Sequence, residues 1–362
     1  MAVPVILRWP DSTPAPPALI AELKPDQVLG AGPVPNAVTT GLWPGIRNPG
    51  TRGDADIASA SREPWIDAAG FLAASQRALG LTTLLAHEHN DPERGVPFDT
   101  LELALIEARV NGGNFVLTVE PRYRAALLAK DAKALEAWRS LCRTAAWLRA
   151  NEALFAHPTH PAITQIIEAG DETPELANLL LRRGASPALV ARVPAPNPAR
   201  IQLLIAASLK TVPDAIYAHA AAGATVVIDS EPSKSWKRVK DDEDRAIYSY
   251  GKGQIVAYKG AIGDPSEFAL DCIDLLTHRR RAARLWNALS AIPLFTTGRL
   301  LHIIQYGGPV TNEIQARVQG IYKQATLLRP DAPPMPLKIY HRGTTTEVFP
   351  PAIHRLAVVQ FV

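Results

Sequence analysis

Over the first 160 residues, short apolar runs alternate with amphipathic stretches, and two of these runs end on polar side chains. Leu81–Ala86 is followed by the polar cluster His87–Asp91, and Phe115–Val119 is followed by Glu120–Arg124. A helical pattern over residues 98–110 lies between them. Strand, helix and strand predict a βαβ unit, whose parallel strands place both clusters at the same edge of a sheet. Ligands of α/β proteins bind at this carboxyl edge, so the two clusters are the first candidates for a functional site.

The pattern divides the chain into three parts. Residues 1–160 hold strand–helix repeats with four or five strands, fewer than a complete eight-stranded barrel needs, and predict a partial (β/α) barrel-like domain or an open sheet. Residues 161–297 restart the alternation and end in a pair of helical patterns, 265–276 and 279–289. We expect a doubly wound α/β domain here, whose strand order resembles amidotransferase-like folds. Residues 298–362 alternate apolar and polar positions between turn signals, which predicts a small β-sandwich.

The composition of the chain limits which binding partners are expected. The 38 Lys and Arg nearly balance the 35 Asp and Glu, so nucleic acid is not expected as a partner. The densest basic cluster, His278–Arg281 with Arg284, falls on a helical pattern and is interpreted as a solvated face or a set of intramolecular partners. No segment has the roughly 18 consecutive apolar residues of a membrane span. The apolar run near Met1 is too short for a signal peptide, so the chain as written is expected in the cytoplasm.

Phosphate-binding and redox motifs are not recognised. No Gly-x-Gly-x-x-Gly or Walker-type loop occurs, and Gly251–Gly253 precedes a strand pattern instead of opening a helix, so no cofactor is expected. Cys142 and Cys272 lie in helical patterns and are expected to be buried free thiols. Neither stands on a strand-to-helix turn where a nucleophile would sit, so the second part is interpreted as structural or oligomerising, and a homo-oligomer is left open.

Glu88 and Glu120 offer a chemistry for the two strand ends. Cleavage of a glycosidic bond requires two carboxylates across a cleft, one as the acid and one as the base or nucleophile. His87 and Asp91 accompany the first carboxylate and Arg122 the second, as candidates for binding the substrate. The alternative is that each glutamate caps a loop or pairs with a nearby arginine.

His87 and His89 raise a metal site as a rival interpretation. Side chains two apart on a strand face the same way, so such a pair can hold a metal if later strands supply further ligands. His157, His160 and His219 do not follow clear strand ends with an acidic partner. The sequence therefore assigns no metal ligand, and a metal-dependent hydrolase stays an alternative.

Two tryptophans favour a carbohydrate ligand. Trp43 and Trp65 flank loops in the first part, with Arg47 and Asp67 beside them. Exposed tryptophans near polar side chains commonly hold sugar rings by stacking and hydrogen bonds. Anchoring of the loops into the core is the alternative.

Five segments of the sequence carry a resemblance to a known family: 41–47, 64–67, 250–253, 284–287 and 325–330. With them, the order of the three parts resembles β-galactosidase-type glycoside hydrolases with a trimerisation domain, and more specifically bacterial glycoside-hydrolase-like proteins. This resemblance covers most of the chain from about residue 30 and implies a carbohydrate-related ancestry. Two departures stand out: the chain has fewer strand–helix units at its start than such proteins, and Glu88 and Glu120 do not map onto the family's acid/base glutamates, which lie on non-adjacent barrel strands.

The expectation is therefore a glycoside-hydrolase-like protein that acts on a carbohydrate through Glu88 and Glu120. A non-catalytic carbohydrate-binding or scaffold protein with a degenerate barrel is the second hypothesis, and the metal-dependent hydrolase is the third.

Overall fold

The computed structural model describes residues 3–47, 65–87, 96–230, 236–276, 281–288, 290–308 and 313–362. Within these ranges the chain is a mixed α/β molecule with several sheets, none of which closes into a barrel. No helix in the described ranges has the length and apolar character that crossing a membrane requires. Both cysteines are free and buried, as predicted.

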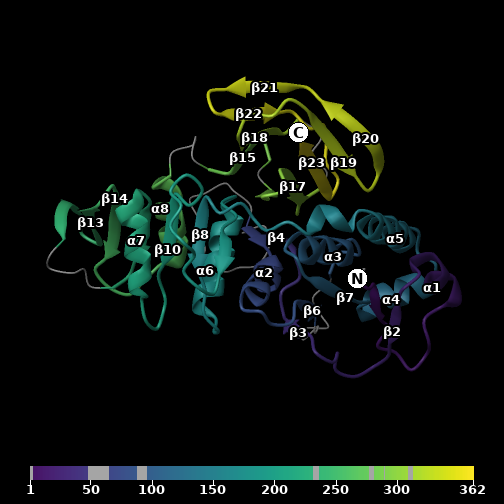
Figure 1. Cartoon of the computed structure of the whole chain (residues 1–362). Helices are drawn as coiled ribbons and strands as arrows, with labels where there is room; N and C mark the ends of the chain where they lie inside the picture. Colours follow the sequence, from purple (N-terminus) through teal and green to yellow (C-terminus); the bar gives the residue numbers. More distant parts are fainter. Residues whose placement is uncertain are drawn as a thin grey trace.

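The first sheet is entirely parallel, in the order β2-β1-β7-β6-β3. A short antiparallel pair, β4 and β5, lies beside it (Figure 1). The strands of the parallel sheet are β1 (Ile6–Arg8), β2 (Gln27–Leu29), β3 (Val38–Thr40), β6 (Leu84–His87) and β7 (Asn114–Thr118). The antiparallel pair consists of β4 (Gly45–Arg47) and β5 (Trp65–Asp67). The helices of this first group are α1 (Pro17–Leu23), α2 (Gly70–Ala78), α3 (Thr100–Val110), α4 (Pro121–Leu128) and α5 (Ala132–Ala150), with a 3-10 turn at Glu152–Phe155.

The predicted βαβ unit is confirmed. Strands β6 and β7 are parallel neighbours, with Leu84 opposite Asn114 and Leu85 opposite Phe115, and α3 connects them. All five residues of β7 are buried, because both faces of the sheet are covered. Helices pack on the face of Phe115 and Leu117, and Val34 and Ala37 of the segment before β3 pack on the face of Val116.

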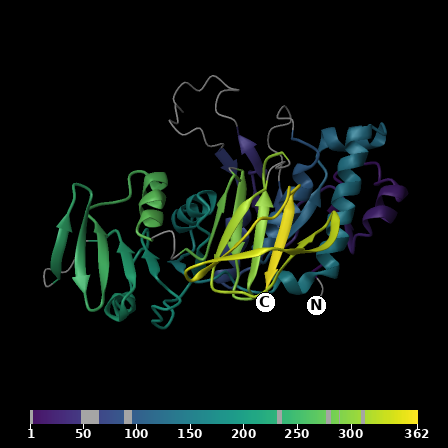
Figure 2. The same cartoon turned by 90° about the horizontal axis from the view of Figure 1, so that it is seen from above.

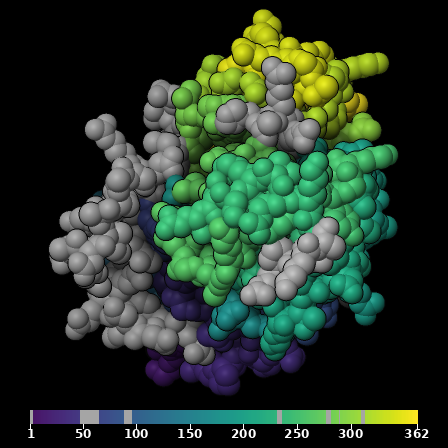
Figure 3. Space-filling view, turned by 90° about the vertical axis from the view of Figure 1, so that its left-hand side faces the viewer, coloured from purple at the N-terminus to yellow at the C-terminus, as the bar shows by residue number. Residues whose placement is uncertain are grey.

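The second sheet has the order β12-β13-β14-β11-β10-β8-β9, parallel from β14 to β9 with an antiparallel hairpin at one edge. One face packs on α6 and α8, and the other packs on α7. The strands are β8 (Ile163–Ile166), β9 (Ala188–Val190), β10 (Leu203–Ala206), β11 (Thr225–Ile228), β12 (Lys237–Asp241), β13 (Arg245–Tyr250) and β14 (Gly253–Tyr258). The helices are α6 (Glu172–Arg182), α7 (Tyr217–Ala222) and α8 (Pro265–Asp274), with a 3-10 turn at Asp214–Ile216. In Figure 3 these residues form the rounded teal and green surface below the yellow C-terminal strands.

Two antiparallel sheets at the C-terminal end face each other across a shared apolar core. Their orders are β15-β18-β22-β21 and β16-β17-β23-β19-β20. In β18 the buried Ala316 and Val318 alternate with more exposed polar residues, as a half-buried strand should. The strands are β15 (Ala283–Trp286), β16 (Ala291–Phe295), β17 (Leu300–Gln305), β18 (Gln315–Gln319), β19 (Ala325–Arg329), β20 (Ala332–Leu337), β21 (Ile339–Arg342), β22 (Thr345–Val348) and β23 (Leu356–Phe361).

The helix expected over residues 279–289 is wrong. Ala283–Trp286 forms strand β15, with Leu285 opposite Ala316 of β18. Ala283 and Leu285 pack against the core of the C-terminal sheets, so buried positions recur every two residues in this segment. Pairing with the neighbouring strand thus overrides the tendency of its arginines and leucine to form a helix. Strands β15 and β16 thus pair with the C-terminal sheets although both precede residue 298, where the third part was expected to begin. The division into three domains, with boundaries after residues 160 and 297, stays a prediction.

The three groups of sheets share packed interfaces. Helix α2 packs on α6 and β9 of the second group, and α3 packs on β17 of the C-terminal sheets. Leu300 and Ile304 of β17 belong to the core of the first group, whereas Leu301 and Ile303 belong to the core between the C-terminal sheets. Figures 1 and 2 show the C-terminal sheets lying against the first group, with the second group beside both.

Glu107 of α3 lies at the point where these interfaces meet. Its carboxylate accepts hydrogen bonds from the backbone N–H of Ala69, at 2.9 and 3.0 Å from its two oxygens, and from the hydroxyl of Tyr306 at 2.6 Å. Burial raises the pKa of Glu107 to about 7, against the opposing effects of these hydrogen bonds and of the nearby charge of Arg182. The protein therefore holds a carboxyl group that changes charge near neutral pH inside its central interface.

Replacing Glu107 with Gln is expected to alter the pH dependence of stability. Because the folded-state pKa lies above the ordinary value of 4.5, the folded protein binds more protons between these values, and this residue's contribution falls as pH rises from about 4.5 to about 7. As pH rises across that window, the unfolding free energy of wild type should fall by up to about 3 kcal/mol relative to that of Glu107→Gln. Urea unfolding at pH 5 and pH 8 measures it, with the exposed Glu136→Gln as the control. An equal pH dependence in wild type and Glu107→Gln would contradict this account.

Candidate functional site

The carboxyl edge of the first sheet holds His87 of the first predicted segment and the start of the second, around Glu120. Strand β6 ends at His87, and β7 ends at Thr118, two residues before Glu120. Because the two strands are parallel neighbours, both end at the same edge of the sheet. His87 is 2% exposed and Glu120 is 7% exposed. The rest of the first cluster, residues 88–91 with the predicted site residues Glu88 and Asp91, lies outside the described residues.

Trp43 packs against this edge. Its ring stacks on that of His87, with 3.8 Å between the centroids and 26° between the planes, and lies 6.2 Å from that of Phe115. Only 8% of Trp43 is exposed, so most of its ring is occupied by protein contacts. The structure therefore places Trp43 in the core, the alternative to an open sugar platform.

Trp65 and Asp67 form a polar pair on β5. The indole Nε1–H of Trp65 donates a hydrogen bond of 3.1 Å to Oδ1 of Asp67. Trp65 is 40% exposed, and the guanidinium carbon of Arg182 lies 4.3 Å from the centroid of its ring. In the strand pair, Trp65 lies opposite Arg47, and Asp67 lies opposite Gly45. Trp65 is thus the predicted aromatic residue that keeps a substantial exposed surface.

Glu120 caps helix α4. Its carboxylate accepts the backbone N–H groups of Arg122 at 3.1 Å and Tyr123 at 2.9 Å, and Pro121 occupies the first helical position, where a missing N–H is tolerated. Arg122 is exposed, with its guanidinium carbon 5.9 Å from the ring centroid of Phe98. Glu120 therefore has a structural task that needs no substrate, which is the alternative that the sequence left open.

The residues in the described ranges provide no set of ligands for the metal site that was considered from the sequence. Among them, no group of three or more His, Cys, Asp and Glu side chains could hold a metal ion. His89, the second member of the proposed pair, is outside those ranges.

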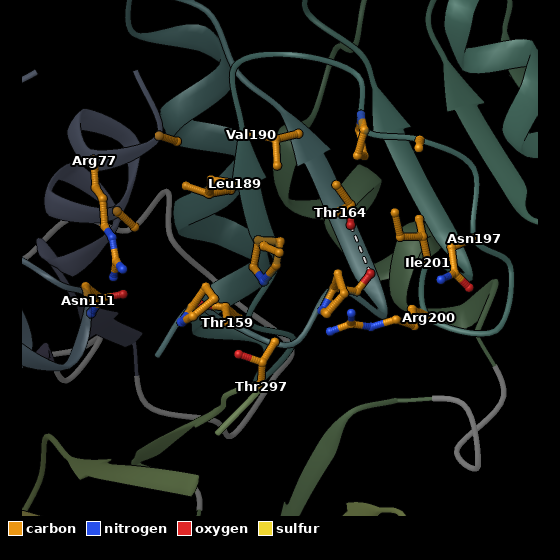
Figure 4. A pocket seen from close by; sticks show the side chains of 18 residues that line it. Arg77, Asn111, Thr159, Thr164, Leu189, Val190, Asn197, Arg200, Ile201 and Thr297 are labelled. Carbon is orange, nitrogen blue, oxygen red and sulfur yellow. Dashed lines mark hydrogen bonds between the residues drawn. The ribbon is translucent and has the colours of Figure 1, made fainter. Parts of the chain in front are cut away.

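A cavity of about 510 Å³ lies between α2 and the second sheet (Figure 4). Arg77 and Asn111 line one side, Thr164 and Arg200 line the other, and Thr297 lies below them in this view. Arg77 and Asn111 stand at the C-terminal ends of α2 and α3, which precede β6 and β7. The cavity is therefore at the amino edge of the first sheet, opposite to the edge that carries His87 and Glu120.

Sequence reasoning did not find this cavity. Its lining residues come from separate segments between residues 74 and 297, without a shared motif or spacing. Their proximity follows from the packing of α2 on α6 and β9, which a single sequence does not display.

Comparison with known proteins gives a likeness of fold without a close relative. No protein-family model matches the chain, and no curated protein matches it in sequence. The α-L-fucosidase isoenzyme 2 of Paenibacillus thiaminolyticus matches with a TM-score of 0.54 at 10% identity, over 81% of this chain and 62% of the fucosidase. This chain thus has a fold similar to that of a glycoside hydrolase and spans less than two thirds of that enzyme's length.

Two further solved structures match less well. The β-galactosidase of Bacillus circulans sp. alkalophilus has a TM-score of 0.46 at 8% identity, over 81% of this chain and 58% of that one. The rhamnosidase of Novosphingobium sp. PP1Y has a TM-score of 0.46 at 14% identity, over 80% of this chain and 32% of that one.

Removing the cap at Glu120 is expected to weaken helix α4. Glu120→Ala should lower the unfolding free energy by about 0.5–2 kcal/mol, because two helix N–H groups lose their acceptor. Glu120→Ser should keep most of the stability, because a serine oxygen caps a helix well. Chemical denaturation of both variants measures this, with Glu136→Ala as the control on an exposed position of α5. Equal losses in the Ala and Ser variants would show that capping is not what Glu120 contributes.

Proposed function

We propose that this chain is a glycoside-hydrolase-like protein that acts on a carbohydrate at the carboxyl edge of its first sheet. The observation that carries the proposal is the parallel pairing of β6 and β7, which end at one edge of the sheet, at the residue before Glu88 and two residues before Glu120 in the sequence. The fold likeness to the fucosidase supports the same class. Glu88 and Glu120 are the proposed acid/base and nucleophile.

A chain of contacts connects this edge to the proposed sugar-binding residues. Trp43 stacks on His87 at the end of β6, and Gly45, two residues after Trp43, pairs with Asp67. Asp67 in turn accepts the hydrogen bond of Trp65, whose ring is partly exposed. An exposed indole held by a carboxylate suits stacking against a sugar ring. Arg47, Asp91 and Arg122 complete the proposed substrate-binding set.

A non-catalytic carbohydrate-binding protein is the second candidate. The double hydrogen bond that commits Glu120 to the start of α4 favours it, as does the open five-stranded sheet in the first part of the described chain. In this case, the sheet edge would bind a sugar without cleaving it.

Two finer assignments are also proposals: that the second part is an amidotransferase-like domain, and that the protein has a trimerising role.

A panel of aryl glycosides tests the proposal. Wild-type protein should hydrolyse at least one of them, and Glu88→Gln and Glu120→Gln should each lower kcat by about 10²- to 10⁴-fold, because each removes a group that transfers a proton or attacks the sugar. Sugar binding, measured by calorimetry, should persist in both variants, and Glu136→Gln should behave as wild type.

Unchanged hydrolysis in both glutamine variants would overturn the assignment of the carboxylate pair. Sugar binding by wild type with no turnover across the panel would favour the second candidate.

A further inference from the structure

The cavity of about 510 Å³ between α2 and the second sheet has an arginine on each of two opposite sides. Arg77 comes from the last turn of α2, in the first group, and Arg200 comes from the turn before β10, in the second group. Figure 4 shows the guanidinium of Arg200 turned toward the side on which Arg77 lies. The volume falls within the range of about 300–1,000 Å³ that is usual for small-molecule sites.

No carboxylate balances these two cations in the described lining of the cavity, which contains neither aspartate nor glutamate. Within the part of the chain that the structure describes, neither guanidinium takes part in a hydrogen bond, an ion pair or a contact with an aromatic ring. The group on which Arg200 acts is another base: burial lowers the pKa of His160, and the charge of Arg200 lowers it further. Both arginines are exposed, so their N–H donors remain available to a ligand.

The position of Arg77 depends on a glycine. A Cβ at Gly112 would lie 2.9 Å from Cδ of Arg77 and still closer to its Nη1, so any other residue there would displace the arginine side chain. Gly112 also has a φ of +79°, which other residues rarely adopt. Arg77 therefore lies along the backbone that follows Asn111, a buried residue of the lining.

The walls of the cavity are mainly apolar and stiff. Thr164 is buried, and its hydroxyl donates a hydrogen bond of 2.9 Å to the carbonyl of Pro161, which Figure 4 draws as a dashed line. Because proline fixes φ, walls rich in proline are largely formed before a ligand binds, which lowers the cost of binding. The described lining includes four prolines and the aliphatic side chains of β9: Pro158, Pro161, Pro187, Pro194, Leu189 and Val190.

We propose that this cavity binds an organic dianion with an apolar middle, a dicarboxylate that places one carboxylate at Arg77 and the other at Arg200. The guanidinium fork matches a planar carboxylate with two parallel hydrogen bonds, and the apolar walls suit a hydrocarbon chain between the two charges. A monocarboxylate engages only one of the arginines. The ligand would bridge the first and second groups. This inference is independent of the proposed function, because the cavity is at the opposite edge of the first sheet from Glu120.

Titration calorimetry with dicarboxylates of increasing length tests the site. Succinate, adipate, suberate and sebacate are each compared with the monocarboxylate and the neutral diol of the same chain length. The best dicarboxylate should bind about tenfold or more tightly than its monocarboxylate, because the second arginine adds a charge-assisted interaction. Affinity should pass through a maximum along the series, since only a matching length reaches both arginines, and it should fall as salt rises.

Arg77→Gln and Arg200→Gln should each weaken binding of the best dicarboxylate by about tenfold, to the level of its monocarboxylate. Arg192→Gln, at an exposed arginine outside the described lining, should leave the affinity unchanged, and so should Glu120→Gln. Thermal unfolding verifies that each variant is folded, and the best dicarboxylate should raise the Tm of the wild type. Arg200 lies on an exposed turn, so Arg200→Gln keeps the test valid even if Arg77→Gln does not fold.

Two results would overturn the proposal: equal affinity for dicarboxylate, monocarboxylate and diol, or unchanged dicarboxylate affinity in the folded arginine variants. A monocarboxylate that binds as tightly as the matched dicarboxylate would show that the two arginines are not bridged, and would also overturn it.

Discussion

The buried carboxylate of Glu107 is the interaction on which the arrangement of the three sheet groups depends. It lies on α3 and accepts hydrogen bonds from two donors remote in sequence, the backbone N–H of Ala69 and the hydroxyl of Tyr306, which is 199 residues away in the C-terminal part. A buried carboxylate needs such partners, because water is excluded from the site. By holding Ala69 it fixes the approach to α2, and with it β5, which carries Trp65 and Asp67. The proposed sugar-binding pair is therefore positioned by the same interaction that joins the parts of the molecule.

Arg182 extends this network to the second sheet. Its guanidinium carbon lies 4.3 Å from the ring centroid of Trp65, its charge acts on Glu107, and it stands in the last turn of α6. One side chain of the second group thus contacts the partly exposed tryptophan of the first group and influences the buried carboxylate of the central interface.

The local elements were more predictable than the contacts between them. The βαβ unit of β6, α3 and β7 follows from apolar runs interrupted by a helical period, and parallel pairing then fixes the shared edge. The segment of strand β15 was predicted as a helix, because its arginine and leucine favour helices locally, whereas Leu285 pairs with Ala316 of β18, a residue far along the chain that the local pattern does not reveal. The capping role of Glu120 can be predicted from its position directly before Pro121. The role of Glu107 cannot, because nothing in the sequence of α3 shows that Tyr306 lies against it.

Charge at the carboxyl edge of the first sheet is already paired within the fold. Glu120 accepts two backbone N–H groups at the start of α4. Arg124, one turn further along that helix, donates a hydrogen bond to the carbonyl of Val119 and lies 3.5 Å from the carboxylate of Asp11. Arg182 and Arg183 stand instead at the C-terminal end of α6, where the helix dipole favours cations. Glu120 is therefore committed to its helix before any ligand binds, which is why the non-catalytic candidate keeps its weight.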